Sequence, residues 1–289
     1  MASSDPALVF RDIRRRFDRI ARDFADADFV HRVTFAGLIE RLRPVVMQPR
    51  QLLDLGCATG AGSRQLARHY RRSRVIGLDA SFAMLREATG RRSLSYRPRV
   101  LQADARRIPL QDGSMDLVFA NMILPCIDDQ AACLSEIARV LRKDGVFAFA
   151  TFGPDSLSEL REAWKSIDDD CHVSAFPDMH DLGDALLRAG FRDAVLDVDH
   201  LDVTYRDTAA LYRDLTGAGA RNCLRGRRQT LTGKSRFRAL DEHLAARMND
   251  NVLSLRLELV YGHAWGGGPR EPSGEFRVDP RAITHRSRN

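Results

Sequence analysis

The segment Leu52–Gly62, LLDLGCATGAG, sets one carboxylate inside an apolar run and follows it with residues that have almost no side chains. The run LLDL predicts a short buried strand, and residues 61–70 after the turn predict a helix. A small-residue turn lets the backbone approach a ligand, and the start of the helix offers free N–H groups. The segment therefore predicts a site for a nucleotide-like ligand at the end of a buried strand.

Strands and helices alternate on the carboxyl side of this segment. Further strands are expected over residues 74–79, 97–104, 114–121, 146–152 and 194–203. Helices are expected over 81–88 with Ser81 as N-cap, 131–142 with Gly145 as its stop, 156–167, and 179–189 closed by Gly190. Such alternation indicates βαβ units around a parallel sheet. We predict an α/β fold with a doubly wound, mostly parallel seven-stranded sheet of Rossmann-like type.

The two ends of the chain have other patterns. Phe10, Ile13, Phe17, Ile20 and Phe24 form one apolar face of an amphipathic helix. The stretch LSLRLELVYGHAW alternates apolar and polar residues, which is typical of an antiparallel strand. The expected organisation is a helical cap at 1–44, a ligand-binding core at 45–198, a small basic helical insertion at 199–252, the last core strand at 253–265 and a disordered tail at 266–289.

Composition restricts the class of protein. The chain has 289 residues and a formal net charge of +6, which fits an acidic partner such as nucleic acid, phosphate or an acidic protein. No apolar run approaches the roughly 20 residues that span a bilayer, and the charged N-terminus does not resemble a signal peptide. The five cysteines form no C-x-x-C pair, which predicts reduced thiols and no metal site. We predict a soluble, cytoplasmic protein with no membrane contact.

Two kinds of ligand compete for the small-residue turn. A dinucleotide site requires G-x-G-x-x-G, and here Gly56, Ala58 and Ala61 would have to fill the three glycine positions. Asp54 would also lie close to the pyrophosphate and repel it. S-adenosylmethionine instead carries a positive sulfonium and a positive α-ammonium, which favour a carboxylate at the end of a strand. The pattern D-x-G-x-G-x-G suits that ligand, and residues 54–60 match it at three of its four positions.

Carboxylates end the successive strands of the predicted sheet. Asp54 ends the first, Asp79 ends the second, where it can accept bonds from both ribose hydroxyls, and Asp104 follows the third, near the expected adenine amino group. The alternative is an ordinary βαβ crossover whose strand-end aspartates are solvated. We favour a cofactor site, because the three carboxylates occur in order at one edge of the sheet.

This arrangement resembles the class I S-adenosylmethionine-dependent methyltransferases over about residues 45–265. In detail the chain is similar to the malonyl-acyl-carrier-protein O-methyltransferases of biotin synthesis. The similar segments are FDRIARDF, ARVLRKDGVFAFATFGPDSLSELREAW, MHDLGDALLRAGF, LYRDLTGAGARN with RGRRQTLTGKSR, and YGHAW. The segment 151–164 and the GAGA segment are much more specific than the methyltransferase core.

The resemblance implies that the protein esterifies the free carboxylate of a malonyl thioester. The acceptor would be malonyl-acyl-carrier protein or malonyl-coenzyme A, and the basic insertion would attract the acidic carrier. A carboxylate is ionised at neutral pH, so no general base is required. Arg213 is the first candidate to clamp it and Arg227 the second, because an arginine fork matches a carboxylate. The cofactor-binding residues expected on this basis are Asp54, Gly56, Cys57, Ala58, Gly60, Asp79, Ala80, Asp104, Ala105 and Asn121.

Three departures from the family pattern leave alternatives open. Ala58 replaces a glycine, which is tolerable where φ is negative, and Phe24 replaces a tyrosine. Pro125 and Cys126 stand where residues of the acceptor site are expected. The alternatives are a methyltransferase for another small acid or a quinone, and a non-catalytic assembly factor that keeps this fold. A nucleic-acid methyltransferase is less favoured, because Met-Ile-Leu-Pro follows Asn121 where N-P-P-Y would be expected.

Overall fold

The computed structural model describes residues 8–90, 99–228, 230 and 232–268. These residues form a seven-stranded sheet in the order β3-β2-β1-β4-β5-β7-β6. The strands are β1 (Gln51–Leu55), β2 (Arg74–Asp79), β3 (Arg99–Gln102), β4 (Met115–Asn121), β5 (Leu141–Phe152), β6 (Phe191–Tyr205) and β7 (Leu253–Gly266). Neighbours from β3 to β5 pair in parallel, and β7 is antiparallel to both β5 and β6. The predicted mixed α/β sheet is therefore confirmed.

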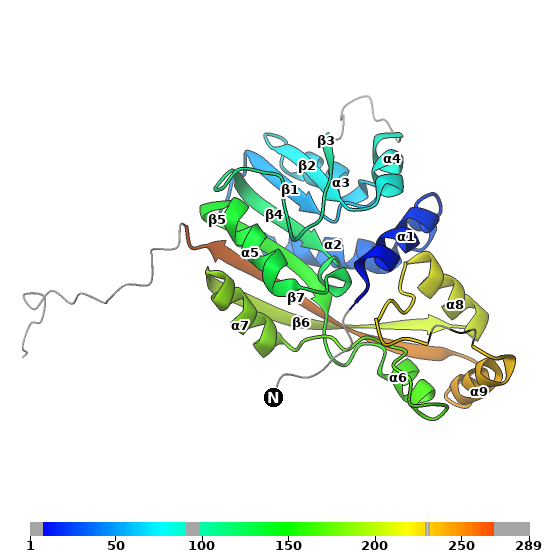
Figure 1. Cartoon of the computed structure of the whole chain (residues 1–289). Coiled ribbons are helices and arrows are strands. Elements are labelled where there is room, and N and C mark those ends of the chain that lie inside the picture. Colours follow the sequence, from blue (N-terminus) through cyan, green and yellow to red (C-terminus); the bar gives the residue numbers. More distant parts are fainter. Residues whose placement is uncertain (1–7, 91–98, 229, 231, 269–289) are drawn as a thin grey trace, which may run out of the picture.

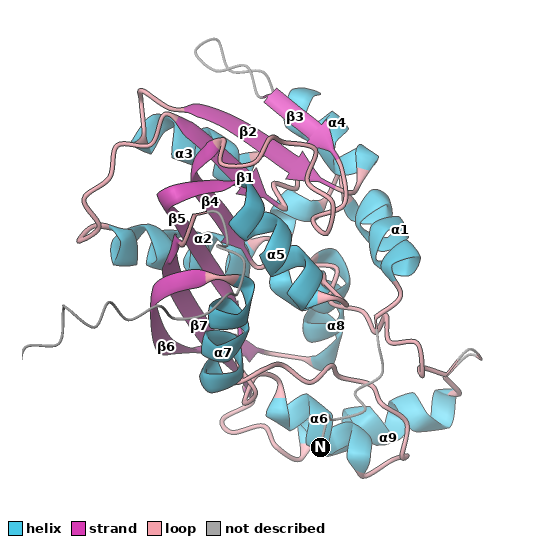
Figure 2. Ribbon diagram, turned by 60° about the vertical axis from the view of Figure 1, so that its left-hand side comes forward, coloured by secondary structure: helices cyan, strands magenta, loops and turns pink. Residues whose placement is uncertain are grey.

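Helices cover both faces of this sheet (Figure 2). On one face lie α2 (Phe29–Leu42) and α3 (Ala61–His69), and on the other lie α5 (Gln130–Val140) and α7 (Met179–Ala189). The ring of Phe35 packs on Phe119 with centroids 5.2 Å apart, and Phe147 stacks on Phe191 at 5.3 Å. Burial of such apolar side chains, at about 2–3 kcal/mol each, holds the layers together.

The N-terminal segment crosses the carboxyl ends of the strands. It comprises α1 (Phe10–Ile20) and the short helix η1 (Phe24–Asp26), so α1 ends before the predicted face does. The Asp23 N–H donates to the Ile20 carbonyl at 3.0 Å and forms a turn after α1. This turn brings the ring of Phe24 against that of Phe17, with centroids 6.3 Å apart. Helix α4 (Phe82–Gly90) lies beside α1, with Ser81 Oγ accepting from the Met84 N–H at its start, as predicted.

The segment expected as an insertion, residues 199–252, begins with the end of a long sheet strand. Strand β6 continues to Tyr205, which pairs with Leu253 of β7, so residues 199–205 of the expected insertion belong to the sheet. The ends of these two long strands form a ribbon beyond the core (Figure 1). Onto it pack α6 (Ser158–Lys165), α8 (Thr208–Gly217) and α9 (Lys234–Ala245). The strand ends stay paired because alternating residues such as Leu253 and Leu255 are buried against these helices.

Gly145 was expected to end the helix over residues 131–142. Gly145 does not stop α5, because Leu141 already pairs with Met115 and Gly145 lies inside β5. A Cβ at Gly145 would lie 3.0 Å from the Arg142 carbonyl oxygen, so glycine permits that close approach.

Strand β7 ends at Gly266, and most of the predicted disordered tail lies outside the described residues. None of the described helices has the length and apolar character to cross a membrane.

Candidate active site

A cavity lies at the carboxyl ends of the central strands, beneath α1. We call it the cofactor cavity. Residues of the core and of α1 line it. A 2.6 Å hydrogen bond from Ser81 Oγ, at the start of α4, to Asp18 holds α1 in this position. The core contributes Gly56, Ala58, Asp79, Ala80, Ala105 and Asn121, and α1 contributes Phe10, Ile13, Arg14 and Phe17. Six of the residues expected to bind the cofactor therefore share one cavity.

The small-residue turn runs along the floor of this cavity. Gly56 has φ 76°, and a Cβ there would lie 2.9 Å from Ile123, so glycine is required. Gly60, the N-cap of α3, has φ 71° but does not line the cavity. Ala58 has φ 45°, which contradicts the condition of negative φ under which its methyl would be tolerable. The loop thus holds an alanine in the left-handed region, at a cost of about 1 kcal/mol.

The Asp79 carboxylate connects the turn after β1 with the turn after β2 through hydrogen bonds. Its Oδ2 accepts from the Ala58 N–H at 2.9 Å, and its Oδ1 accepts from the Ser81 N–H at 2.8 Å. Burial raises the pKa of Asp79, although these backbone bonds oppose the rise. Each carboxylate oxygen keeps a second lone pair, so Asp79 can still accept bonds from two hydroxyls in the cavity.

Asp54 lies at the end of β1 and is 3% exposed. Ser63 Oγ donates to its Oδ2, yet burial raises its pKa to about 6. Asp54 lines a second cavity, which we call the loop cavity, with Cys57 and the start of α3. A buried carboxylate with a raised pKa is stabilised by a cationic ligand, because an adjacent positive charge favours its ionised form.

The loop cavity fits the amino-acid end of S-adenosylmethionine. Asn121 donates from Nδ2 to the His31 carbonyl at 2.9 Å, while its Oδ1 is buried without a partner among the described residues. That oxygen and the Asp54 carboxylate both suit an ammonium group. Arg32 also lines this cavity, where its guanidinium pairs with the Asp28 carboxylate at 2.6 Å. Cys57 lines it too, with its thiol packed toward Gly77 and its pKa raised by burial.

The structure does not bring Asp104 into the cofactor cavity, although Ala103 and Ala105 line it. Arg106 forms a two-point pair with the Asp104 carboxylate, with contacts of 2.6 and 3.0 Å. Burial would raise the pKa of Asp104, but the bonds from Arg106 outweigh it and hold the pKa below its usual value. The same guanidinium contacts Asp128 at 2.6 Å and lies over the Phe10 ring. Asp104 thus forms a structural ion pair here, and its contact with adenine stays a prediction.

A third cavity adjoins the first on the side of the insertion. We call it the acceptor cavity. It is mainly apolar, and Pro125 and Cys126 line it at the positions where the sequence placed acceptor residues. Burial raises the pKa of the Cys126 thiol to about 12, so that thiol stays neutral. Two arginines line the cavity, namely Arg16 of α1 and the exposed Arg221.

Arg16 is the half-buried cation of the acceptor cavity. Its Nη1 donates to the Gly219 carbonyl at 2.6 Å, and its Nη2 contacts the Cys223 sulfur. Burial lowers the pKa of the Arg16 guanidinium, and no carboxylate of the described residues lies within ion-pair distance of it. Sequence reasoning missed Arg16 because it lies among five other arginines on and after α1. The absence of a carboxylate partner in the described part of the chain distinguishes it once the chain is folded.

Neither arginine expected to clamp the substrate lines this cavity. Arg213 is exposed on α8, whose inward face is formed by Leu211. Arg227 instead donates to Asp12 of α1 at 2.6 Å. The pattern of a basic segment does not reveal which of its arginines face inward, so the sequence could not place Arg213 and Arg227 relative to this cavity.

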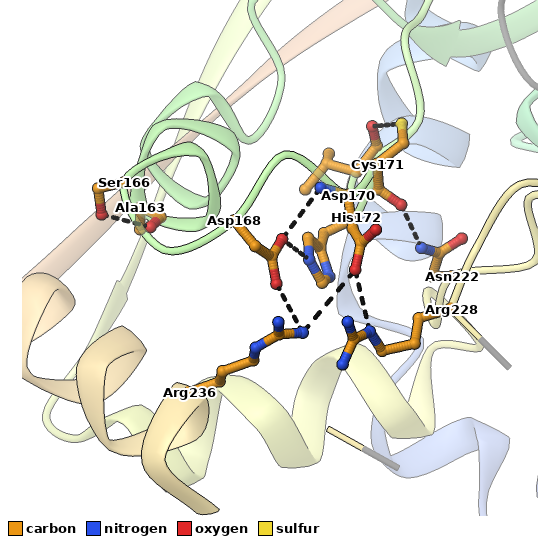
Figure 3. Close-up of polar contacts among 10 residues, drawn as sticks. Ala163, Ser166, Asp168, Asp170, Cys171, His172, Asn222, Arg228 and Arg236 are labelled. Carbon is orange, nitrogen blue, oxygen red and sulfur yellow. Dashed lines mark hydrogen bonds and ion pairs between the residues drawn. The ribbon is translucent and has the colours of Figure 1, made fainter. Parts of the chain in front are cut away.

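Figure 3 shows polar contacts between the loop after α6 and residues of the insertion; of the residues labelled there, His172 and Asn222 line the acceptor cavity. Asp168 binds His172 at 2.7 Å and Arg236 at 3.2 Å, and Asp170 binds Arg228 at 3.1 Å. His172 also stacks on Trp164 with centroids 3.7 Å apart. Asp168, Asp170 and His172 lie close enough together to ligate a metal, but two guanidiniums already neutralise their carboxylates. The cluster therefore joins the loop after α6 to α9.

Comparison with known proteins agrees with this geometry. A model of the methyltransferase domain matches residues 53–149. The chain is 39% identical to a malonyl-[acyl-carrier protein] O-methyltransferase of Halorhodospira halophila, covering 96% of each chain. It is 38% identical to the enzyme of the same name from Gallionella capsiferriformans, over 89% of this chain and 91% of that one. The solved YcgJ protein of Bacillus subtilis shares the fold, with a TM-score of 0.60, 16% identity, and coverage of 81% of this chain and 98% of that one.

The strand order, the glycine-rich turn and the strand-end carboxylates define a class I S-adenosylmethionine-dependent methyltransferase. The chain is similar to these two enzymes over nearly its whole length, which shows its family within this class. The chain belongs to the malonyl-[acyl-carrier protein] O-methyltransferase family.

Proposed function

We propose that this protein methylates the free carboxylate of a malonyl thioester carried on acyl carrier protein, as a step of biotin synthesis. The observation that carries the proposal is Arg16, which has no carboxylate partner among the described residues and lines an apolar cavity that adjoins the cofactor cavity. A malonyl group has a short apolar body and one anionic end, which matches this lining. The cytoplasmic location of the protein stays a prediction from the sequence.

The residues of the chain would bind, orient and desolvate the reactants. S-adenosylmethionine supplies an electrophilic methyl group, and a carboxylate oxygen bonds to that methyl as the methyl–sulfur bond breaks, with its electron pair left on sulfur. No proton moves, which agrees with the neutral thiol of Cys126 and with the lack of any requirement for a base. Asp54 and Asn121 would hold the amino-acid end of the cofactor, Asp79 its ribose, and Arg16 the acceptor carboxylate. Such positioning is the main source of rate in a displacement of this kind.

The exposed side chains around α1 support an acidic carrier as partner. On α1 the residues opposite its buried face include the exposed Arg11, Arg15 and Arg19. Arg221, Arg225 and Arg228 are exposed on the neighbouring segment, which pairs with the chain before α1 through Leu8 and Leu224. Complementary charge of this kind raises association rates with an acidic protein.

Mass spectrometry tests the proposal directly. Malonyl-acyl carrier protein incubated with the protein and S-adenosylmethionine should gain one methyl ester, and acetyl-acyl carrier protein should gain nothing. The chain should also restore growth of a biotin-requiring strain that lacks this activity. Equal labelling of both carriers, or labelling of neither, would contradict the proposal and favour another small acid or a quinone as acceptor.

A further inference from the structure

One side chain lies where the three cavities meet. His31, near the start of α2, lines the cofactor cavity, the loop cavity and the acceptor cavity. No other described residue lines all three. Arg16, in contrast, lines only the acceptor cavity among them, and Asp54 lines only the loop cavity. The methyl group must pass between the cofactor cavity and the acceptor cavity. Both cavities are lined by Ile13, Phe17, His31, Met122 and Cys126, and among these His31 has the imidazole, which can donate a strong hydrogen bond.

Neighbouring residues hold the His31 ring in place. Its backbone carbonyl accepts the 2.9 Å hydrogen bond from Asn121 Nδ2, and its ring contacts Phe24 edge to face with centroids 5.1 Å apart. Its Nδ1 is buried and has no hydrogen-bond partner among the described residues.

The charge state of His31 suits this position. Burial lowers its pKa to about 4, so the imidazole is neutral at physiological pH. A neutral ring has one N–H donor and one acceptor nitrogen. A positive ring would repel the sulfonium of the cofactor, whereas a neutral ring does not.

We propose that His31 donates a hydrogen bond to the acceptor carboxylate and thereby points one oxygen at the methyl group. The proposal rests on the proposed function and adds a second contact to that of Arg16. The two residues divide the work: Arg16 binds the anion on the acceptor side, and His31 orients it at the junction. A neutral donor suits orientation, because a second cation would stabilise the ground-state carboxylate and slow its attack.

Two variants separate this role from packing. His31→Leu keeps an apolar side chain against Phe24 but has no donor, and His31→Gln restores an N–H donor and an oxygen acceptor. With malonyl-coenzyme A, His31→Leu should lower kcat/KM at least about tenfold, or about 1.4 kcal/mol, while the Kd for S-adenosylhomocysteine changes by less than about threefold. His31→Gln should recover most of the loss. A leucine variant with wild-type kcat/KM, or one that loses cofactor affinity as much as kcat/KM, overturns the proposal.

A binding measurement gives a readout independent of turnover. In protein labelled with ¹⁵N-histidine and saturated with S-adenosylhomocysteine, the imidazole signal missing from His31→Leu should shift when malonyl-coenzyme A is added. Acetyl-coenzyme A, which lacks the carboxylate, should leave it unchanged. If the wild type methylates malonyl thioesters but the signal does not respond, only the role of His31 is wrong. If the wild type does not methylate them, the proposed function and this role fail together.

Discussion

The Oδ2 atom of Asp79 accepts a 2.9 Å hydrogen bond from the backbone N–H of Ala58. This bond links the end of β2 to the turn after β1 and holds Ala58 at φ 45°, in the left-handed region. The carboxylate thus shapes the loop and also lines the cofactor cavity. The loop keeps a strained alanine because the bond to Asp79 and the packing around it determine its backbone.

Replacing Ala58 with glycine should stabilise the protein. Glycine adopts the left-handed region freely, and this gain exceeds its greater entropy in the unfolded chain, for a net of about 0.5–1 kcal/mol. Thermal unfolding should show a midpoint roughly 1–3 °C higher, with affinity for S-adenosylhomocysteine retained. A lower midpoint would show that the methyl group contributes packing that outweighs its strain.

Asp54→Asn should stabilise the protein without cofactor and weaken cofactor binding. The folded pKa of about 6 lies above the unfolded value, so folding takes up a proton between about pH 4 and 6 and stability falls as pH rises through that window. At pH 7 the charged carboxylate costs about 2–3 kcal/mol, and the amide removes that cost. Urea unfolding at pH 5 and pH 7 measures it.

The side-chain amide of the Asp54→Asn variant can still accept the bond that Ser63 donates to Asp54. It lacks the charge that attracts the cationic cofactor, so the Kd for S-adenosylmethionine should rise at least about tenfold. A variant no more stable than the wild type at pH 7 would mean that Asp54 is not ionised at a cost in the folded protein.

Arg16→Ala should reduce methylation of malonyl thioesters, since it removes the half-buried cation of the acceptor cavity. The expected loss in kcat/KM is on the order of 30- to 1000-fold, equivalent to about 2–4 kcal/mol, with cofactor affinity nearly unchanged. Arg16→Lys keeps the charge without the fork and should be intermediate. Arg213→Ala, which removes an exposed arginine of α8, is the matched control and should retain wild-type kinetics. Loss of kcat/KM in Arg213→Ala but not in Arg16→Ala would mean that Arg213 binds the acceptor carboxylate.

Charge reversal on α1 should affect the carrier protein but not a small acceptor. The double variant Arg15→Glu, Arg19→Glu should lower kcat/KM for malonyl-acyl carrier protein by about tenfold or more, because it opposes an acidic surface. Malonyl-pantetheine, which has no protein to dock, should react as before. Arg71→Glu with Arg72→Glu is the control, since these exposed residues precede β2 at the amino ends of the strands, whereas α1 crosses the carboxyl ends. Equal effects of the two double variants would mean that the carrier docks elsewhere.

Local pattern accounts for most of the fold. Hydrophobic periodicity and the turn residues predicted β2 with its observed bounds, and they predicted α7 with Gly190 at φ 97° as its cap. They also placed Asp54 and Asp79 at strand ends that meet at one edge. Parallel topology makes this possible, because all the strands of βαβ units present their carboxyl ends together. The same reasoning failed at Gly145, where pairing with β4 outweighed a local turn signal.

The sequence by itself determined the class of protein, because the alternation of strands and helices and the small-residue turn follow from local patterns. The sequence also placed the carboxylates of Asp54 and Asp79, whereas only the tertiary structure decided which other polar side chains lie at the site. Arg16 donates a hydrogen bond to the carbonyl of Gly219, 203 positions further along the chain. Arg106 forms an ion pair with Asp104, which the sequence analysis had assigned to the cofactor. His31 gains its position only when α2 packs on the strand ends. The physical reason is that burial and charge pairing depend on contacts between distant segments, about which local periodicity carries no information.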